Sequence, residues 1–183
     1  MKLSINSLPS NILNKLIELT EKSDLRCNHS AVLVDKKRNI ISTGYNYTRT
    51  YFKGSTCTSV HAEQKAIGSY YNHHISFKNN KWNYYECKNR HKKSLDLIVI
   101  RVKRNKDGLE WRDSSPCVQC LNLIKKVNIR RVLYTTGNDD EIIQEKVNNM
   151  VTEHITIGNC IVEFIKKHGY LDRKYVYQYR DVG

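Results

Sequence analysis

Hydrophobic and polar residues follow two periods along this chain, one typical of helices and one typical of strands. Apolar residues at helical spacing predict helices over 11–22, 61–70, 116–127, 139–150 and 160–168. Apolar runs that alternate or are nearly continuous predict strands at 29–35, 39–46, 95–104, 130–136 and 153–157. The polar turn KKR joins the first two strands, which we interpret as a hairpin.

The second half of the chain alternates strands with helices, a pattern typical of parallel crossover connections. A helix over 139–150 would separate the strands 130–136 and 153–157, so we expect these last two strands to run parallel. A length of 183 residues suits one domain of ordinary size. We therefore predict a single α/β domain over 1–183, three-layered α/β/α, with a mixed central sheet of about five strands, the last two parallel.

One segment departs from this alternation, at about residues 71–94. It carries six lysines and arginines against Glu86 alone, a net charge of +5, and it shows no clear apolar periodicity. Long insertions of this kind are usually functional or disordered. We expect a basic insertion on the surface.

The whole chain is basic, with a formal net charge of +13. This charge favours an anionic partner, either nucleic acid or a phosphorylated small substrate. It is equally compatible with an A/T-rich coding sequence, because Lys, Asn, Ile and Tyr are abundant together. No segment approaches the roughly 18 apolar residues of a membrane span, and the N-terminus lacks a signal-peptide core. We expect a cytoplasmic protein without a membrane partner, whose six cysteines are metal ligands or free thiols.

Two short stretches carry the candidate chemistry. Cys117 and Cys120 lie three residues apart at the start of a predicted helix, where both sulfurs share one side and the helix terminus favours thiolates. His61 also stands at the start of a predicted helix. If the two helix starts meet, three ligands surround a zinc ion and a fourth position stays open, as in catalytic sites. The alternatives for the two cysteines are a redox dithiol or half of a zinc ribbon.

Glu63 follows His61 by two residues, beside the expected open position rather than within the ligand set. A carboxylate there can take a proton from an attacking water and pass it to a ring nitrogen and to a leaving amine. The histidine would hold the metal, and the glutamate would be the catalytic residue that moves protons.

The combination of HAE at 61–63 with SPCVQC at 115–120 matches the His-x-Glu and Pro-Cys-x-x-Cys signature of zinc deaminases. With ISTGYN at 41–46, the chain resembles the cytidine and deoxycytidylate deaminase superfamily from about Asn28 to Thr136. The resemblance implies a zinc-dependent hydrolytic deaminase that converts a cytosine nucleotide or nucleoside to its uracil form and releases ammonia. It also implies a homo-oligomer, and substrate contacts by Asn46, Ala62 and Ser115.

The substrate stays open at this point. We favour a free nucleotide such as dCMP, with Arg49, Lys53 or Arg112 as the cation for its phosphate. The alternative is a basic nucleic-acid-binding or RNA/ssDNA-editing module on the same zinc fold. Some phage members of the superfamily carry a second zinc, and the resemblance suggests its ligands here as Cys27, Cys57, Cys87 and His91. Unrelated free thiols are the alternative.

Overall fold

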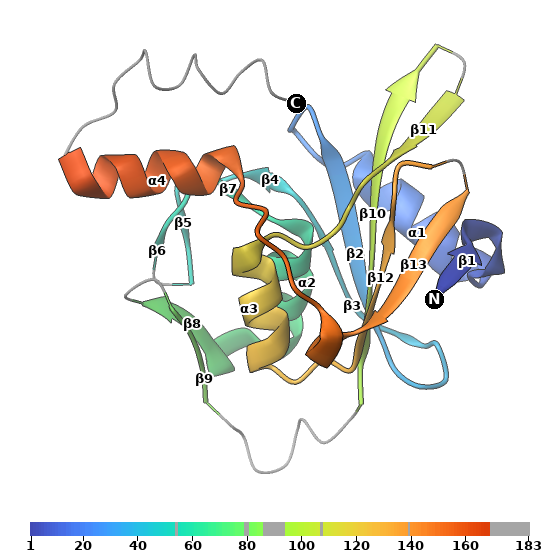
Figure 1. The fold of residues 1–183 in the computed structure, drawn as a ribbon, viewed down its shortest axis with the longest axis horizontal. Coiled ribbons are helices and arrows are strands. Elements are labelled where there is room, and N and C mark those ends of the chain that lie inside the picture. Colours follow the sequence, from blue (N-terminus) through green and yellow to red (C-terminus); the bar gives the residue numbers. More distant parts are fainter. Residues whose placement is uncertain (54, 79–80, 86–93, 107, 139, 169–183) are drawn as a thin grey trace.

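The structure is a computed structural model, and it describes residues 1–53, 55–78, 81–85, 94–106, 108–138 and 140–168 (Figure 1). Within this part of the chain, no helix combines the length and the hydrophobicity that a membrane span requires.

A mixed seven-stranded sheet forms the centre of the molecule, in the order β1-β13-β12-β10-β2-β3, with β11 paired to β10. β10 and β12 run parallel, whereas the other neighbouring strands run antiparallel. The strands are β1 (Lys2–Ser4), β2 (Asn28–Val34), β3 (Ile40–Tyr45), β10 (Asp96–Asn105), β11 (Gly108–Arg112), β12 (Arg131–Thr135) and β13 (Glu141–Lys146). Among the described residues, three small two-stranded pairs lie outside this sheet. They are formed by β4 (Tyr47–Thr48) with β7 (Ser59–Val60), β5 (Tyr51–Phe52) with β6 (Ser55–Thr56), and β8 (Ile75–Lys78) with β9 (Lys81–Tyr84).

Helices cover both faces of the sheet and complete the three layers (Figure 1). On one face, α1 (Ser10–Thr20) buries Ile12 and Leu16 against the inward side chains of the strands. On the other face lie α2 (Ala62–Tyr71) and α3 (Val118–Lys126), over a second apolar cluster that includes Leu97 and Val99. The buried strand β10 contributes to both clusters, which explains its nearly continuous apolar run. The predicted α/β/α layers and mixed sheet are confirmed.

The end of the sheet differs from the prediction. The segment expected as a helix over 139–150 forms β13, which returns from β12 as an antiparallel hairpin. The segment expected as a strand at 153–157 forms no strand, and its last residue already begins α4 (Ile157–His168). The prediction of two parallel final strands is therefore wrong, and the sheet has seven strands rather than about five. The segment forms a strand because β13 pairs with β12 on one side and with β1 on the other. The local periodicity of the sequence does not reveal this pairing.

The expectation of a basic surface insertion at about 71–94 stays a prediction, and the described part of this segment contains core residues as well as surface ones. Tyr71 ends α2, and the β8–β9 hairpin buries Ile75, Phe77 and Trp82 in the cluster beneath α2 and α3. The Trp82 Nε1–H donates to the Gln119 carbonyl oxygen at 3.1 Å, which fixes the hairpin against α3. The alternation of apolar and polar residues in each short strand had been obscured by the neighbouring lysines.

Candidate metal centre and active site

The candidate site lies where the N-termini of α2 and α3 meet. His61 is the N-cap residue of α2, and Cys117 is the N-cap residue of α3, so α3 begins two residues later than its sequence predicts. The Gln64 Nε2–H donates to Gln119 Oε1 at 3.0 Å and ties the two first turns together. Strand β3 supports α2 closely, because a Cβ at Gly44 would lie 2.3 Å from the Ala62 carbonyl oxygen. The two helices therefore hold the site at a fixed height above the sheet.

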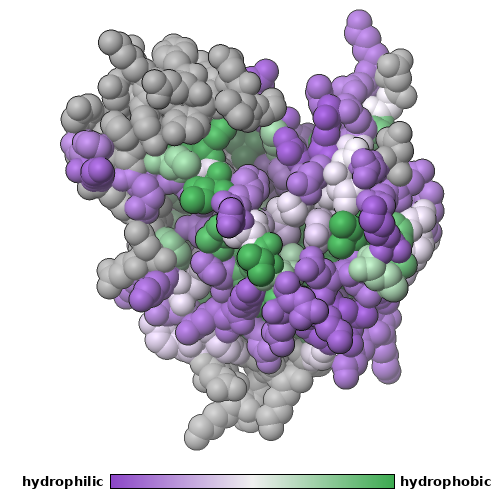
Figure 2. All heavy atoms as spheres, viewed as in Figure 1, coloured by the Kyte–Doolittle hydropathy of each residue, from purple (hydrophilic) through white to green (hydrophobic). Residues whose placement is uncertain are grey.

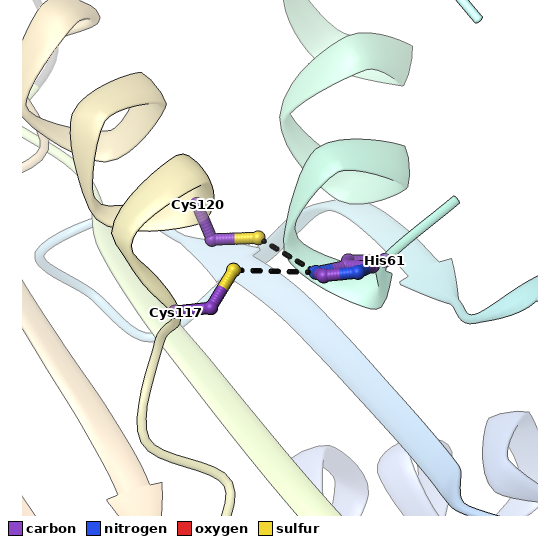
Figure 3. Close-up of side chains that lie close together, drawn as sticks. All are labelled: His61, Cys117 and Cys120. Atoms are coloured by element: carbon purple, nitrogen blue, oxygen red, sulfur yellow. Dashed lines mark hydrogen bonds between the residues drawn. The ribbon is translucent and has the colours of Figure 1, made fainter. Parts of the chain in front are cut away.

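Three candidate ligand atoms converge at this point (Figure 3). His61 Nδ1 lies 3.2 Å from Cys120 Sγ and 3.5 Å from Cys117 Sγ. All three ligand atoms lie within 4.8 Å of one another, and both cysteines are buried. Ligands at tetrahedral zinc bond lengths stand about 3.5 to 3.8 Å apart. One nitrogen and two sulfurs at this spacing fit a zinc ion, and within the described residues no other histidine, cysteine or acidic group forms such a cluster.

The pKa values of the two cysteine thiols shift in opposite directions. A hydrogen bond from Cys120 lowers the pKa of Cys117 to about 4, against the effect of burial, and His61 contributes in the same direction. Burial raises the pKa of Cys120 well above its usual value, and its hydrogen bond to Cys117 adds to this effect. Cys117 is therefore poised as a thiolate, the form that binds a metal. A bound dication would favour loss of the second proton as well.

Glu63 lies in the first turn of α2, beside this cluster, and only 5% of its surface is exposed. Burial raises the pKa of its carboxyl group, while the nearby His61 lowers it to a smaller extent. A buried carboxyl group with a raised pKa exchanges a proton more readily near neutral pH than an exposed one does. The position suits a group that both accepts and returns a proton.

A cavity of about 610 Å³ opens onto these residues. His61, Glu63 and Cys117 line its floor, and the connection from β13 to α4 supplies one wall. Figure 2 shows hydrophobic side chains on the outer side of that connection, where Val151 and Ile155 are exposed. The full lining is Cys27, His29, Asn46, Ser59, His61, Ala62, Glu63, Arg101, Asp113, Ser115, Cys117 and residues 154–158.

The three residues expected to contact substrate all line this cavity. Asn46 is buried, its Oδ1 accepts from the His29 backbone N–H and from Ser23 Oγ, both at 2.8 Å, and its Nδ2 donates to the Cys27 carbonyl oxygen at 2.6 Å. Ser115 donates through both its backbone N–H and its hydroxyl to the Asp113 carboxylate, each at 2.9 Å. Ala62 is fully buried at the start of α2. Their roles toward a substrate stay predictions.

The residues suggested for a second zinc are not brought into one cluster within the described part of the chain. The Cys27 thiol lies at the main cavity and accepts from Arg101 Nη2 at 2.9 Å. The Cys57 thiol donates to the Arg49 carbonyl oxygen at 3.1 Å. Cys87 and His91 lie outside the described residues.

Comparison with known proteins places this site in a family. A family model, described as the cytidine and deoxycytidylate deaminase zinc-binding region, matches residues 9–136, more than half of the chain. The chain belongs to the cytidine and deoxycytidylate deaminase family. It is a hydrolytic deaminase of the cytidine deaminase type, and zinc is its metal. No curated protein sequence matches the chain.

Several solved structures are similar to the chain at low sequence identity. A cytidine deaminase from Burkholderia pseudomallei is 11% identical, with a TM-score of 0.49, over 81% of this chain and 100% of that one. A dCMP deaminase from the cyanophage S-TIM5 is 19% identical, with a TM-score of 0.38, over 73% of this chain and 89% of that one. A cytidine deaminase from Mycobacterium tuberculosis is 9% identical, with a TM-score of 0.46, over 82% of this chain and 100% of that one.

Sequence reasoning missed four ionisable side chains of the cavity wall: His29, Arg101, Asp113 and His154. His29 and Arg101 occupy opposed positions on β2 and β10, at the end of the sheet where the metal centre lies. Asp113 lies two residues before the SPC stretch, which is the one local signal that could have indicated it. His154 follows the unexpected β13, so its place depended on the hairpin that the sequence did not predict.

Proposed function

We propose that this protein hydrolytically deaminates the cytosine base of a free nucleotide or nucleoside, with a dCMP-like nucleotide preferred, and releases ammonia. The observation that carries the proposal is the position of Glu63 beside the cluster of His61, Cys117 and Cys120, on a cavity lined by Glu63, His61 and Cys117. A module that only bound a ligand would have no use for a buried carboxyl group there.

His61, Cys117 and Cys120 would hold the zinc, and the cavity side of the cluster would stay open to water and substrate. Zinc, when bound, acts as a Lewis acid and lowers the pKa of water toward 7. Glu63 would accept one proton from the attacking water and give it to N3 of the cytosine ring as the water oxygen bonds to C4. It would then accept the remaining proton of that oxygen and give it to the amine, so that ammonia leaves as the C4–N bond breaks and the C4 carbonyl forms. Its raised pKa suits the return of that proton.

The cavity wall would position the base and the sugar. Asn46 Nδ2 donates to the Cys27 carbonyl oxygen and lies 3.5 Å from His29 Nδ1, so its second amide hydrogen would turn from that long contact toward a sugar hydroxyl. The Asp113 carboxylate accepts two hydrogen bonds from Ser115, and through them it would hold the backbone before Cys117 next to the reacting amine. A cavity of about 610 Å³ lies within the range of small-molecule sites, roughly 300–1,000 Å³.

A substrate panel tests the proposal. Purified protein with stoichiometric zinc would be given cytidine, deoxycytidine, CMP, dCMP and a short cytosine-containing oligonucleotide, and ammonia release would be measured. We expect turnover of the free compounds, with dCMP favoured by kcat/KM. Turnover of the oligonucleotide alone would transfer the enzyme to the editing class. No turnover, together with salt-dependent binding of the oligonucleotide, would identify a nucleic-acid-binding module instead.

A further inference from the structure

Arg101 lies on β10 and faces the same cavity as the metal centre. It stands opposite His29 on β2 and opposite Arg112 on β11, and its backbone N–H donates to Thr135 Oγ1 at 3.3 Å. The buried Thr135 hydroxyl in turn bonds to Ser114 Oγ at 2.9 Å, directly beside the loop that carries Cys117. The position of Arg101 is therefore fixed relative to the metal ligands by the sheet itself.

The charge of Arg101 has no counter-ion within the described part of the chain. Its guanidinium makes one side-chain contact there, from Nη2 to Cys27 Sγ, which is a weak acceptor. By contrast, Arg130 and Arg131 both pair with the Asp96 carboxylate. A guanidinium carries five N–H donors, so most of those on Arg101 have no recorded partner among the described residues. A half-buried guanidinium that has no counter-ion among the described residues is suited to bind an anionic ligand.

Arg101 is also the single lysine or arginine that lines the cavity within the described residues. The three cations proposed from the sequence lie elsewhere. Arg49 bonds to the Tyr51 carbonyl oxygen at 2.6 Å, and Lys53 bonds to the Asn72 carbonyl oxygen at 2.5 Å. Arg112 pairs with Glu110. None of these three lines the cavity.

Apart from Glu63, the acidic side chain on the cavity wall is Asp113. Both of its carboxylate oxygens accept hydrogen bonds from Ser115, which spreads part of the negative charge into the loop. No ion pair joins Asp113 to Arg101. A ligand with an anionic end at Arg101 and a hydroxyl toward Asp113 would meet complementary groups at both places.

We infer that Arg101 is a specificity-determining residue that binds the phosphate of a pyrimidine nucleoside 5′-monophosphate through charge-assisted hydrogen bonds. The inference rests on the proposed deamination, and it names the part of the substrate that separates nucleotide from nucleoside. His29, the cross-strand neighbour of Arg101, lines the same cavity. The guanidinium of Arg101 is the permanently charged group of this pair.

The test compares dCMP with deoxycytidine in four proteins: the wild type, Arg101→Gln, Arg101→Lys and Lys103→Gln. Lys103 lies two residues along the same strand, is exposed and does not line the cavity, so it controls for the loss of one positive charge. Arg101→Gln should lower kcat/KM for dCMP by about 10- to 100-fold, mainly through KM, because a remote contact persists from ground state to transition state. The ratio of dCMP to deoxycytidine kcat/KM should fall by the same factor. Arg101→Lys should give an intermediate ratio, and Lys103→Gln the wild-type ratio.

An unchanged ratio in Arg101→Gln, with zinc content and melting temperature retained, would overturn the inference. An equal loss on both substrates would also overturn it, since that is the result expected of a purely structural arginine. Calorimetry with dUMP and deoxyuridine separates this inference from the proposed function. In a protein that deaminates neither substrate, tighter binding of dUMP that is lost in Arg101→Gln supports the phosphate contact, whereas equal binding of the two ligands rejects it. If Arg101→Gln does not fold, Arg101→Lys carries the same comparisons.

Discussion

Gly44 sets the distance between β3 and the helix that carries His61 and Glu63. An added Cβ would lie 2.3 Å from the Ala62 carbonyl oxygen and 2.4 Å from the Ala66 amide nitrogen, and both of these are backbone atoms. Ordinary van der Waals contact begins at 3.4 Å, so the start of α2 must move by about 1.1 Å in the Gly44→Ala variant. Overpacking of this kind costs about 1–3 kcal/mol. Because the moving element holds catalytic groups, a displacement of about 1 Å can also lower kcat by about 100-fold.

Gly68 provides the matched control, because it lies in the same helix but faces a side chain rather than backbone. A Cβ there would lie 2.9 Å from Phe52 Cζ, the far end of a ring that can rotate away. Alanine in a helix interior gains up to about 1 kcal/mol over glycine, so Gly68→Ala should be close to neutral. Urea denaturation gives the free energy of unfolding, and metal analysis gives the zinc content.

In Gly44→Ala, we expect the free energy of unfolding to fall by about 2 kcal/mol and zinc affinity to fall with it. Without the clash, alanine in a strand would be more favourable than glycine by roughly 0.5–1 kcal/mol. The sign of the change in the free energy of unfolding therefore shows whether the clash between the added Cβ and α2 occurs. A Gly44→Ala protein as stable as the wild type, with full zinc content, would refute the close approach of α2 to β3.

Three further predictions concern the metal, the sheet and the cavity. The Cys117→Ala variant should lose the bound zinc, whereas Cys160→Ala should keep it, because Cys160 lies outside the cluster. A full equivalent of zinc in Cys117→Ala, measured by metal analysis, would reject the ligand set. Asp96→Asn should lower the free energy of unfolding by about 1–3 kcal/mol, because it leaves the partly exposed Arg130 and Arg131 without their shared carboxylate. Although burial raises the pKa of Asp96, the two arginines lower it overall, so the difference from wild type should be complete above about pH 4 and shrink below it. Burial, helped by the charge of Arg101, lowers the pKa of His29 to about 3. The contribution of His29 to the stability of the wild type should therefore be fully present above about pH 6.5 and decline as the pH falls toward 3, by up to about 1.4 kcal/mol per pH unit. His29→Gln should flatten that decline, as measured by urea titrations at pH 7 and pH 5.

The convergence of His61, Cys117 and Cys120 could be predicted from the sequence because its signals are local. His61 with Glu63, and Cys117 with Cys120, each lie within one helical turn, and ligand chemistry then restricts what the two stretches can do together. The central strands could be predicted for a similar reason, since β10 is buried on both faces and its apolar run records that burial.

The remaining features depend on contacts between distant segments. The residues of β13 include Glu141, Gln144 and Glu145, which suit a helix, but edge pairing with β1 and β12 makes the segment a strand. The cavity wall at 154–158 follows from that hairpin. Arg101 lies at the cavity because of the strand order, and nothing in its neighbouring residues indicates a site.

The central claim is that the Glu63 carboxyl group transfers protons during deamination, and its exchange for an amide in Glu63→Gln tests this claim most directly. Glu63→Gln keeps the size of the side chain and leaves His61, Cys117 and Cys120 in place, but it cannot carry the proton. Ammonia release from dCMP and deoxycytidine would be measured in wild type, Glu63→Gln and Glu18→Gln, the last lying on α1 across the sheet. The account predicts one equivalent of zinc in all three proteins, wild-type turnover in Glu18→Gln, and a loss in Glu63→Gln of at least about 100-fold in kcat. Wild-type turnover in a zinc-loaded Glu63→Gln protein would contradict it.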